Sequence, residues 1–215
     1  MSVDVQTIYR VMIYGWFERV WHWLQAAFIM ILMLTGIEIH GSYSLFGFET
    51  AVRIHNFVAW AFIVLIALAI FWHFTTGEWR QYQPTGERSI VRQAHYYAFG
   101  IFRGEDHPYR KTELRKLNPL QKTTYLAFKI LIVPVMVTTG LLYMFYNTWQ
   151  DSFSGMLGWV ATVHAIGAFL LVAFLIAHVY MTTTGHTPTS NIKAMITGYE
   201  CIEGEPSGKK EVLPC

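Results

Sequence analysis

The stretch GWVATVHAIGAFLLVAFLIAHVYM, residues 158–181, decides the fold expected for this chain. It contains no Asp, Glu, Lys or Arg, and as an α-helix it is long enough to cross a hydrocarbon core about 30 Å thick. Its two histidines, His164 and His178, leave one face of such a helix roughly 21 Å apart along its axis. Ionisable side chains at membrane depth are costly and mark function, so this spacing predicts ligands for two cofactors at two depths.

The composition of the whole chain is typical of a membrane protein. Of its 215 residues, 53% are hydrophobic and only 14% are charged, which excludes an ordinary soluble domain. Apolar runs predict four spans, at about residues 20–39, 54–74, 124–146 and 158–181. Because backbone polar groups in lipid must be bonded within each helix, we expect an all-α, up-down four-helix bundle that forms a single domain over residues 1–215.

The placement of Lys and Arg predicts the orientation of this bundle. Nine of the sixteen lie in the connection at residues 75–123, whereas Arg53 is the only one in the two loops on the opposite side. The positive-inside rule therefore places both termini, this connection and the tail at residues 182–215 in the cytoplasm. Within the connection, residues 90–102 combine Arg92 with several aromatic side chains, which predicts a cytoplasmic interfacial helix on the anionic inner leaflet.

Histidines at the ends of the spans supply partners for the two in the fourth span. With alternating helix directions, His22 lies at the inner level with His178, and His55 lies at the outer level with His164. A six-coordinate haem iron takes two axial ligands and His is a common one, so these pairs predict two b haems. His73 also lies at the inner level, and it either replaces His22 or hydrogen-bonds a haem propionate or a quinone.

The sequence around these histidines resembles a known family, the di-haem membrane cytochrome b subunits of formate dehydrogenase, nickel–iron hydrogenase and thiosulfate reductase. The resemblance covers nearly the whole chain and rests on Arg19–Gly36, Arg53-Ile54-His55-Asn56, Val163-His164 and Ala177-His178. Three further segments are most similar to the thiosulfate reductase type: residues 77–80, 116–122 and 184–199.

The resemblance implies which residues bind the cofactors. By position, the ligands of the two haem irons are His22, His55, His164 and His178. The quinone pocket of the family lies beside the inner haem at the start of the third helix, which implies Asn118 and Gln121 here. Amide side chains suit a quinone carbonyl and its arriving proton. The residues alone also predict that Asn118 caps a helix whose first position is Pro119.

Together these observations predict a di-haem cytochrome b subunit of a respiratory oxidoreductase complex in a bacterial or archaeal inner membrane. It would pass electrons between a redox partner at the outer face and the membrane quinone pool. The expected partners are membrane lipid, quinone, and an iron–sulfur protein, multihaem cytochrome, molybdoenzyme or hydrogenase, with no nucleic acid. Whether the chain itself counts as an enzyme depends only on its quinone chemistry.

Two other functions stay open at this point. A stand-alone cytochrome b that oxidises superoxide and reduces quinone needs positive charge at its outer face, where Arg53 is the only basic side chain. A haem-free membrane anchor or transporter would use the histidines to pair with one another or to relay protons.

Overall fold

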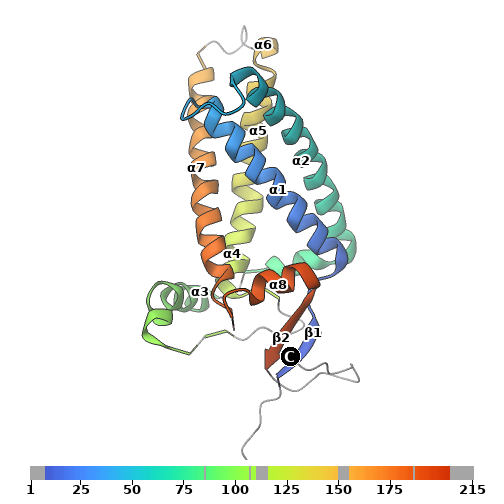
Figure 1. The fold of residues 1–215 in the computed structure, drawn as a ribbon, viewed down its shortest axis with the longest axis vertical. Helices are drawn as coiled ribbons and strands as arrows, with labels where there is room; N and C mark the ends of the chain where they lie inside the picture. Colours follow the sequence, from blue (N-terminus) through green and yellow to red (C-terminus); the bar gives the residue numbers. More distant parts are fainter. Residues whose placement is uncertain are drawn as a thin grey trace, which may run out of the picture. The chain divides into compact units, whose positions relative to one another are not determined.

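A computed structural model describes residues 8–84, 86–106, 108–109, 116–149, 155–185 and 187–203. The described residues are mainly helical, so the predicted all-α class is confirmed (Figure 1). Four helical segments are long and apolar enough to cross a membrane: Trp16–Ile39 (α1), Phe48–Thr76 (α2), Pro119–Met144 and Leu157–Thr182 (α7). The chain is therefore a multi-pass membrane protein, as the hydropathy predicts.

The helices extend beyond the apolar runs from which they were predicted. The second span was expected from residue 54, but α2 begins at Phe48. Its first turn holds an ion pair on one face, Arg53 to Glu49, with a nitrogen–oxygen distance of 2.5 Å. Hydropathy marks only the part of a helix that faces lipid, whereas backbone hydrogen bonding continues into polar turns that water can reach.

The chain forms two compact units. The first, here called the bundle unit, comprises Trp21–Arg80 and Thr124–Ala177 and holds most of all four spans. The second, the polar unit, comprises Met1–Val20, Gln81–Thr123 and His178–Cys215.

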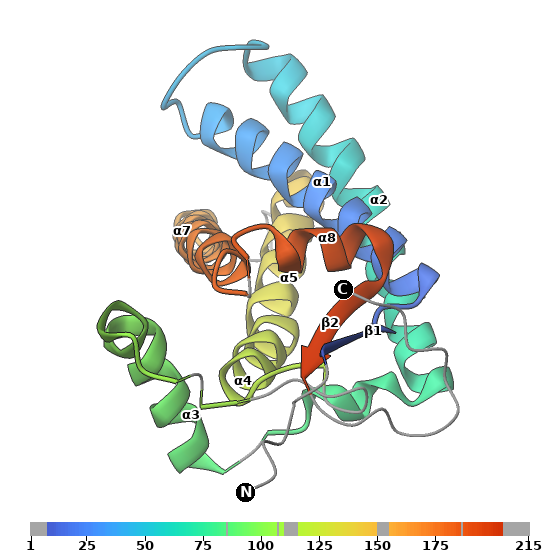
Figure 2. The same ribbon diagram turned by 60° about the horizontal axis from the view of Figure 1, so that its bottom comes forward.

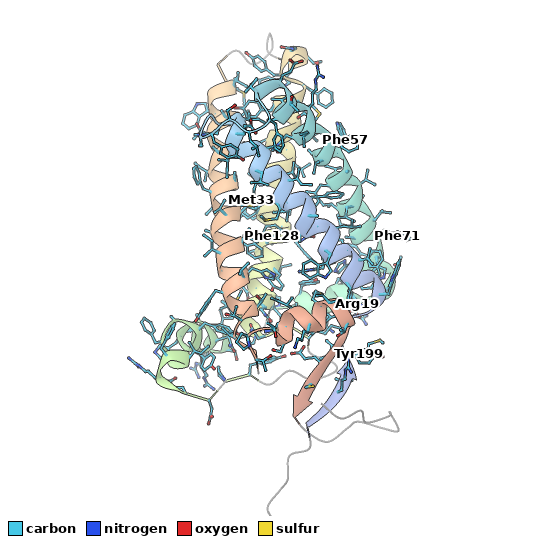
Figure 3. The ribbon with its side chains drawn as sticks, viewed as in Figure 1. Arg19, Met33, Phe57, Phe71, Phe128 and Tyr199 are labelled. Carbon is cyan, nitrogen blue, oxygen red and sulfur yellow. The ribbon has the colours of Figure 1, made fainter. Side chains whose placement is uncertain are left out.

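The surface of the bundle unit is apolar. On α2, the side chains of Phe57 and Phe71 are 76% and 68% exposed and lie on the outside of the helix (Figure 3). Phe128 is buried and stacks on Phe174 of α7 with ring centroids 4.7 Å apart. Large exposed aromatic side chains would promote aggregation in water, but they are the expected contact with lipid chains.

The third span is interrupted next to Pro134. It runs as α4 (Pro119–Ala127), a π-helical turn η4 (Phe128–Ile132) and α5 (Val133–Met144). Pro134 has no backbone N–H and cannot continue the ordinary i to i−4 ladder. Just before it, the N–H of Val133 donates to the carbonyl of Phe128, five residues earlier. The wider turn therefore absorbs the irregularity next to the proline.

Glu38 organises the loop between α1 and α2. Its side chain is 4% exposed, and Oε1 accepts hydrogen bonds from three successive backbone N–H groups, those of Leu45, Phe46 and Gly47, each at 2.8 Å. Hydrogen bonds to an ionised carboxylate are stronger than those between neutral groups. Glu38 therefore holds the chain in place immediately before α2 begins.

The polar unit contains a small antiparallel sheet that the sequence analysis did not predict. Strand β1 (Ile8–Met12) pairs with β2 (Tyr199–Glu203), and Met12 lies opposite Tyr199 (Figure 2). Helix α8 (Ser190–Thr197) leads into β2 through Gly198, whose carbonyl accepts hydrogen bonds from the N–H groups of Ile13 and Tyr14. Pairing of β1 with β2 requires that the segments before the first span and after the fourth lie on the same side of the membrane.

The predicted interfacial helix is also present in the polar unit. It runs as α3 (Glu87–His95), a π-helical turn η2 (Tyr96–Gly100) and a 3-10 turn η3 (Ile101–Arg103). Gln93 and Tyr97 are buried on one face, whereas Val91, Phe99 and Phe102 are exposed. This distribution fits a helix that lies at a membrane surface. Two shorter helical turns complete the described elements, η1 (Glu78–Tyr82) and α6 (Tyr146–Trp149).

Candidate functional site

The bundle unit brings His55 and His164 together. His55 lies near the start of α2 and His164 near the start of α7, and the centroids of their rings are 6.5 Å apart. They come from helices that are more than a hundred residues apart in sequence, so only the folded bundle brings them together. Both side chains are partly buried among the helices.

A threonine on α1 fixes the protonation of His55. The hydroxyl of Thr35 donates to the carbonyl oxygen of Ile31 at 2.8 Å, so its oxygen acts as acceptor toward Nδ1 of His55, 2.9 Å away. In this arrangement Nδ1 carries the ring proton, because a hydroxyl whose hydrogen is already used can only accept. The other nitrogen, Nε2, is left with a lone pair.

The same arrangement recurs on the other side of the pair. The hydroxyl of Thr139 on α5 donates to the carbonyl of Val135 at 2.6 Å and accepts from Nδ1 of His164 at 2.8 Å. His164 therefore also carries its proton on Nδ1 and keeps a lone pair on Nε2. Metal-bound histidines almost always donate their other ring N–H in this way.

A glycine follows each of these threonines and lets the histidine approach closely. A Cβ atom added at Gly36 would lie 3.4 Å from Cε1 of His55, and one added at Gly140 would lie 3.5 Å from Cε1 of His164. Such a Cβ atom would make an ordinary van der Waals contact with the imidazole at either position. Gly36 therefore lies beside the ring of His55 and Gly140 beside the ring of His164, in addition to any role of these glycines in helix packing.

This pair fits the iron of a haem. Two imidazoles that bind one metal from opposite sides, at nitrogen–metal distances of about 2 Å, have ring centroids roughly 6 to 6.5 Å apart. The observed separation of 6.5 Å agrees with this estimate. In the part of the chain that the structure describes, no group of three or more His, Cys, Asp or Glu side chains could hold a metal ion. A haem needs only two protein ligands, because the porphyrin supplies the other four.

His73, at the other end of α2, is held differently. Its ring is buried, and Nδ1 lies 2.6 Å from the carbonyl oxygen of Ala69, one turn earlier in the same helix. Nδ1 is therefore the protonated nitrogen. Nε2 lies 3.3 Å from Nζ of Lys129, whose ammonium group also lies 5.2 Å from the ring centroid of Trp21. With Nε2 accepting from Lys129, the lone pair that an iron would need is already used.

The two histidines predicted at the inner level belong to different units. His22 lies in the second turn of α1, in the bundle unit, and its ring meets that of Trp23 edge-on, with centroids 5.2 Å apart. His178 lies in the last turns of α7, in the polar unit. Each is partly buried, and their pairing stays a prediction.

Asn118 and Gln121 form a capping box at the start of α4. Oδ1 of Asn118 accepts from the backbone N–H of Gln121 at 2.8 Å, and Oε1 of Gln121 accepts from the N–H of Asn118 at 3.0 Å. The amide Nδ2 of Asn118 donates to the hydroxyl of Tyr97 at 3.0 Å. Burial raises the pKa of this Tyr97 phenol, so it stays protonated at neutral pH. The predicted helix start is therefore present, and the role of both amides toward quinone stays a prediction.

The sequence analysis missed three side chains of these sites, namely Thr35, Thr139 and Lys129. The two threonines carry a visible signal, because each stands in an apolar span and directly precedes a glycine. Threonines in membrane helices usually bond only to their own backbone, so the signal does not by itself point to a histidine. Lys129 lies within the π-helical turn of the third span.

Comparison with known proteins identifies the class to which this geometry belongs. Residues 13–198 match the family described as Prokaryotic cytochrome b561. The chain is also 30% identical over 201 residues to the "Putative cytochrome YdhU" of Escherichia coli (strain K12). That alignment covers 88% of this chain and 74% of the relative.

Proposed function

We propose a function that is based on the family of this chain. The chain belongs to the prokaryotic cytochrome b561 family, so it is a membrane cytochrome that carries haem b and transfers electrons. Beyond this, we propose that it holds two b haems. In this proposal it transfers electrons between a redox partner at the outer face and the quinone pool of a bacterial or archaeal inner membrane. It would act as a subunit of a respiratory oxidoreductase complex.

The outer haem would be held by His55 and His164. The observation that carries this assignment is that both rings, 6.5 Å apart, donate through Nδ1 to a threonine and so keep Nε2 for a metal. When bound, the haem supplies reversible transfer of single electrons at its iron. Two protein ligands leave no open position for oxygen, which favours electron transfer over oxygen chemistry.

The inner haem would be held by His22 and His178. The contacts of His73 support His22 over His73, because Nε2 of His73 accepts from Lys129. In this assignment His73 and Lys129 do not bind the iron. A histidine and a lysine at this depth are suited to hydrogen-bond a haem propionate or a quinone oxygen.

Quinone would react at the inner level, near Asn118 and Gln121. The amide hydrogens of Gln121 are suited to a quinone carbonyl, while its Oε1 maintains the start of α4. Electron transfer between the two levels would move charge through the membrane field, which is worth about 2.3 kcal/mol per charge per 100 mV for a complete crossing. The β1–β2 pairing supports a topology with both ends on one side, and the distribution of Lys and Arg makes that side the cytoplasm.

The haem content of the purified protein tests this proposal. The intact chain, isolated in mild detergent, is expected to show b-type absorbance in a reduced-minus-oxidised spectrum and two haems per polypeptide. One haem per polypeptide would overturn the di-haem proposal. Co-purifying iron–sulfur, multihaem, molybdenum or hydrogenase subunits would support the respiratory complex. Superoxide-dependent quinone reduction by the chain alone would favour the stand-alone cytochrome instead.

A further inference from the structure

The outer histidine pair is built from two copies of one small unit. In each copy, a Thr-Gly dipeptide on one helix holds a histidine on the next helix along the bundle. Thr35-Gly36 of α1 holds His55 of α2, and Thr139-Gly140 of α5 holds His164 of α7. The two copies agree closely. The Thr–His distances are 2.9 and 2.8 Å, and a Cβ atom added at the glycine would lie 3.4 or 3.5 Å from Cε1 of the histidine.

We propose that Thr35 and Thr139 are a matched pair of positioning residues that fix both ligands of the outer haem and lower its reduction potential. This inference rests on the proposed binding of that haem by His55 and His164. Neither threonine is expected to touch the iron, and each acts only through the imidazole that it contacts.

The positioning role follows from the way each hydroxyl is anchored. Thr35 donates to the carbonyl of Ile31 and Thr139 to that of Val135, each four residues earlier in its own helix. Each oxygen therefore points an acceptor lone pair in a direction set by a rigid helix. An imidazole that donates Nδ1–H to such an acceptor is held in one tautomer and one ring orientation.

The effect on potential follows from the same bond. A ring that donates its N–H to an acceptor is a stronger base at its other nitrogen, because electron density shifts toward Nε2. A more basic ligand stabilises ferric iron more than ferrous iron, and hydrogen bonding around the ligands is one of the means by which a protein sets haem potential. Both axial ligands carry this bond, so their effects on the potential should act in the same direction.

Substitution by valine tests the proposal, because valine keeps the shape of threonine and removes the hydroxyl. The variants are Thr35→Val, Thr139→Val and the double variant, with Thr35→Ser and Thr139→Ser as versions that retain the hydroxyl. Thr162→Val is the matched control. Thr162 lies on α7 two residues before His164, and its hydroxyl donates to the carbonyl of Gly158 on its own helix.

The readouts are the number of haems per polypeptide and the midpoint potential of each haem in a redox titration of the purified protein. Each Val variant should shift the outer haem to a more positive potential. The double variant should shift it further, while the inner haem stays unchanged. The Ser variants and Thr162→Val should behave as the unaltered protein. Loss of one haem in the Val variants but not in the Ser variants would equally support the positioning role.

Three results would overturn the inference. They are an unchanged outer potential in Val variants that keep both haems, a shift of the same size in the Ser variants, or haem loss in both the Val and the Ser variants. Failure of the underlying ligand assignment is recognised separately, with His55→Ala. If that variant keeps two haems, the assignment itself is wrong. If it loses one haem while the Val variants keep their potential, only the role of the threonines is rejected.

Discussion

His55 and His73 lie on the same helix, α2, eighteen residues or five turns apart, and therefore on the same face. Their imidazoles are nevertheless held in opposite ways. His55 donates Nδ1–H to Thr35 on a neighbouring helix and keeps Nε2 available. His73 donates Nδ1–H to the carbonyl of Ala69 in its own helix and accepts from Lys129 at Nε2.

The difference separates His55, which we propose as a haem ligand, from His73, which we do not. Both histidines lie on the same face of α2 and near an end of a span, so helix phase and position alone do not distinguish His55 from His73. The hydrogen-bond partners of the ring nitrogens do distinguish the two histidines. A ring bonded only at Nδ1 keeps the lone pair of Nε2 for a metal, whereas a ring bonded at both nitrogens has no lone pair left for one.

Removal of an outer ligand should have the strongest effect. His55→Ala or His164→Ala should remove the outer haem and leave the inner one, because the iron loses one of its two protein ligands. Haem content of the purified variant should fall from two per polypeptide to one, with b-type absorbance from the inner haem still present. Retention of both haems in the His55 and His164 variants would contradict the assignment.

Glu38→Ala should weaken the outer end of α2 more than the inner end. The substitution removes the acceptor of three backbone hydrogen bonds, and at about 0.5 to 1.5 kcal/mol for each bond lost, unfolding should become easier by roughly 2 to 4 kcal/mol. Thermal release of haem, followed by absorbance, should occur at a lower temperature for the outer haem. Glu49→Ala is the control, because its ion pair with Arg53 is exposed. Equal effects of the two variants would contradict the role given to Glu38.

Two variants of Gln121 separate its capping role from its proposed role toward quinone. Gln121→Ala should lose the capping box, which costs about 1 kcal/mol, and should also slow quinone reaction. Gln121→Glu keeps an acceptor oxygen for the cap but has no amide hydrogens, so it should slow quinone reaction while the thermal stability is retained. Stopped-flow oxidation of the reduced haems by a soluble quinone measures the rate. Unchanged kinetics in the Glu variant would remove Gln121 from the quinone site.

His73→Ala should have the smallest effect on haem content. Because both ring nitrogens of His73 are bonded to protein groups, the variant should keep two haems, whereas His22→Ala should lose the inner haem. The haem to polypeptide ratio of the two variants, purified in parallel, decides between them. A variant of His73 with one haem, beside a variant of His22 with two, would reverse the assignment of the inner ligand.

The parts of this molecule that depend on local sequence could be predicted. Hydropathy predicted the four spans, and the alternating directions of the helices put His55 and His164 at one level, where their ring centroids lie 6.5 Å apart. The threonine contacts could not be predicted, because they depend on how neighbouring helices rotate about their axes. Side-chain hydrogen bonds of threonine within its own helix look the same in sequence whether or not a histidine lies beside it.

The small sheet was missed for a different reason. Each strand has five residues, and the two are separated by nearly the whole chain. A segment this short carries little periodicity, and its partner cannot be identified without knowing that an even number of spans returns the chain to the same side. The apolar runs predicted the bundle because each helix satisfies its own backbone, whereas a strand depends on a distant one.

The sheet also forms late in biosynthesis, because its two strands lie near opposite ends of the described chain. At synthesis rates of about 5–20 residues per second, β2 is synthesised roughly 10 to 40 s after β1. During that interval β1 presents an unpaired edge, which can pair with a strand of another chain. The edge can pair only after the last span has been made, because β2 follows α7 in the chain. A chain whose translation stops before β2 would keep this edge unpaired.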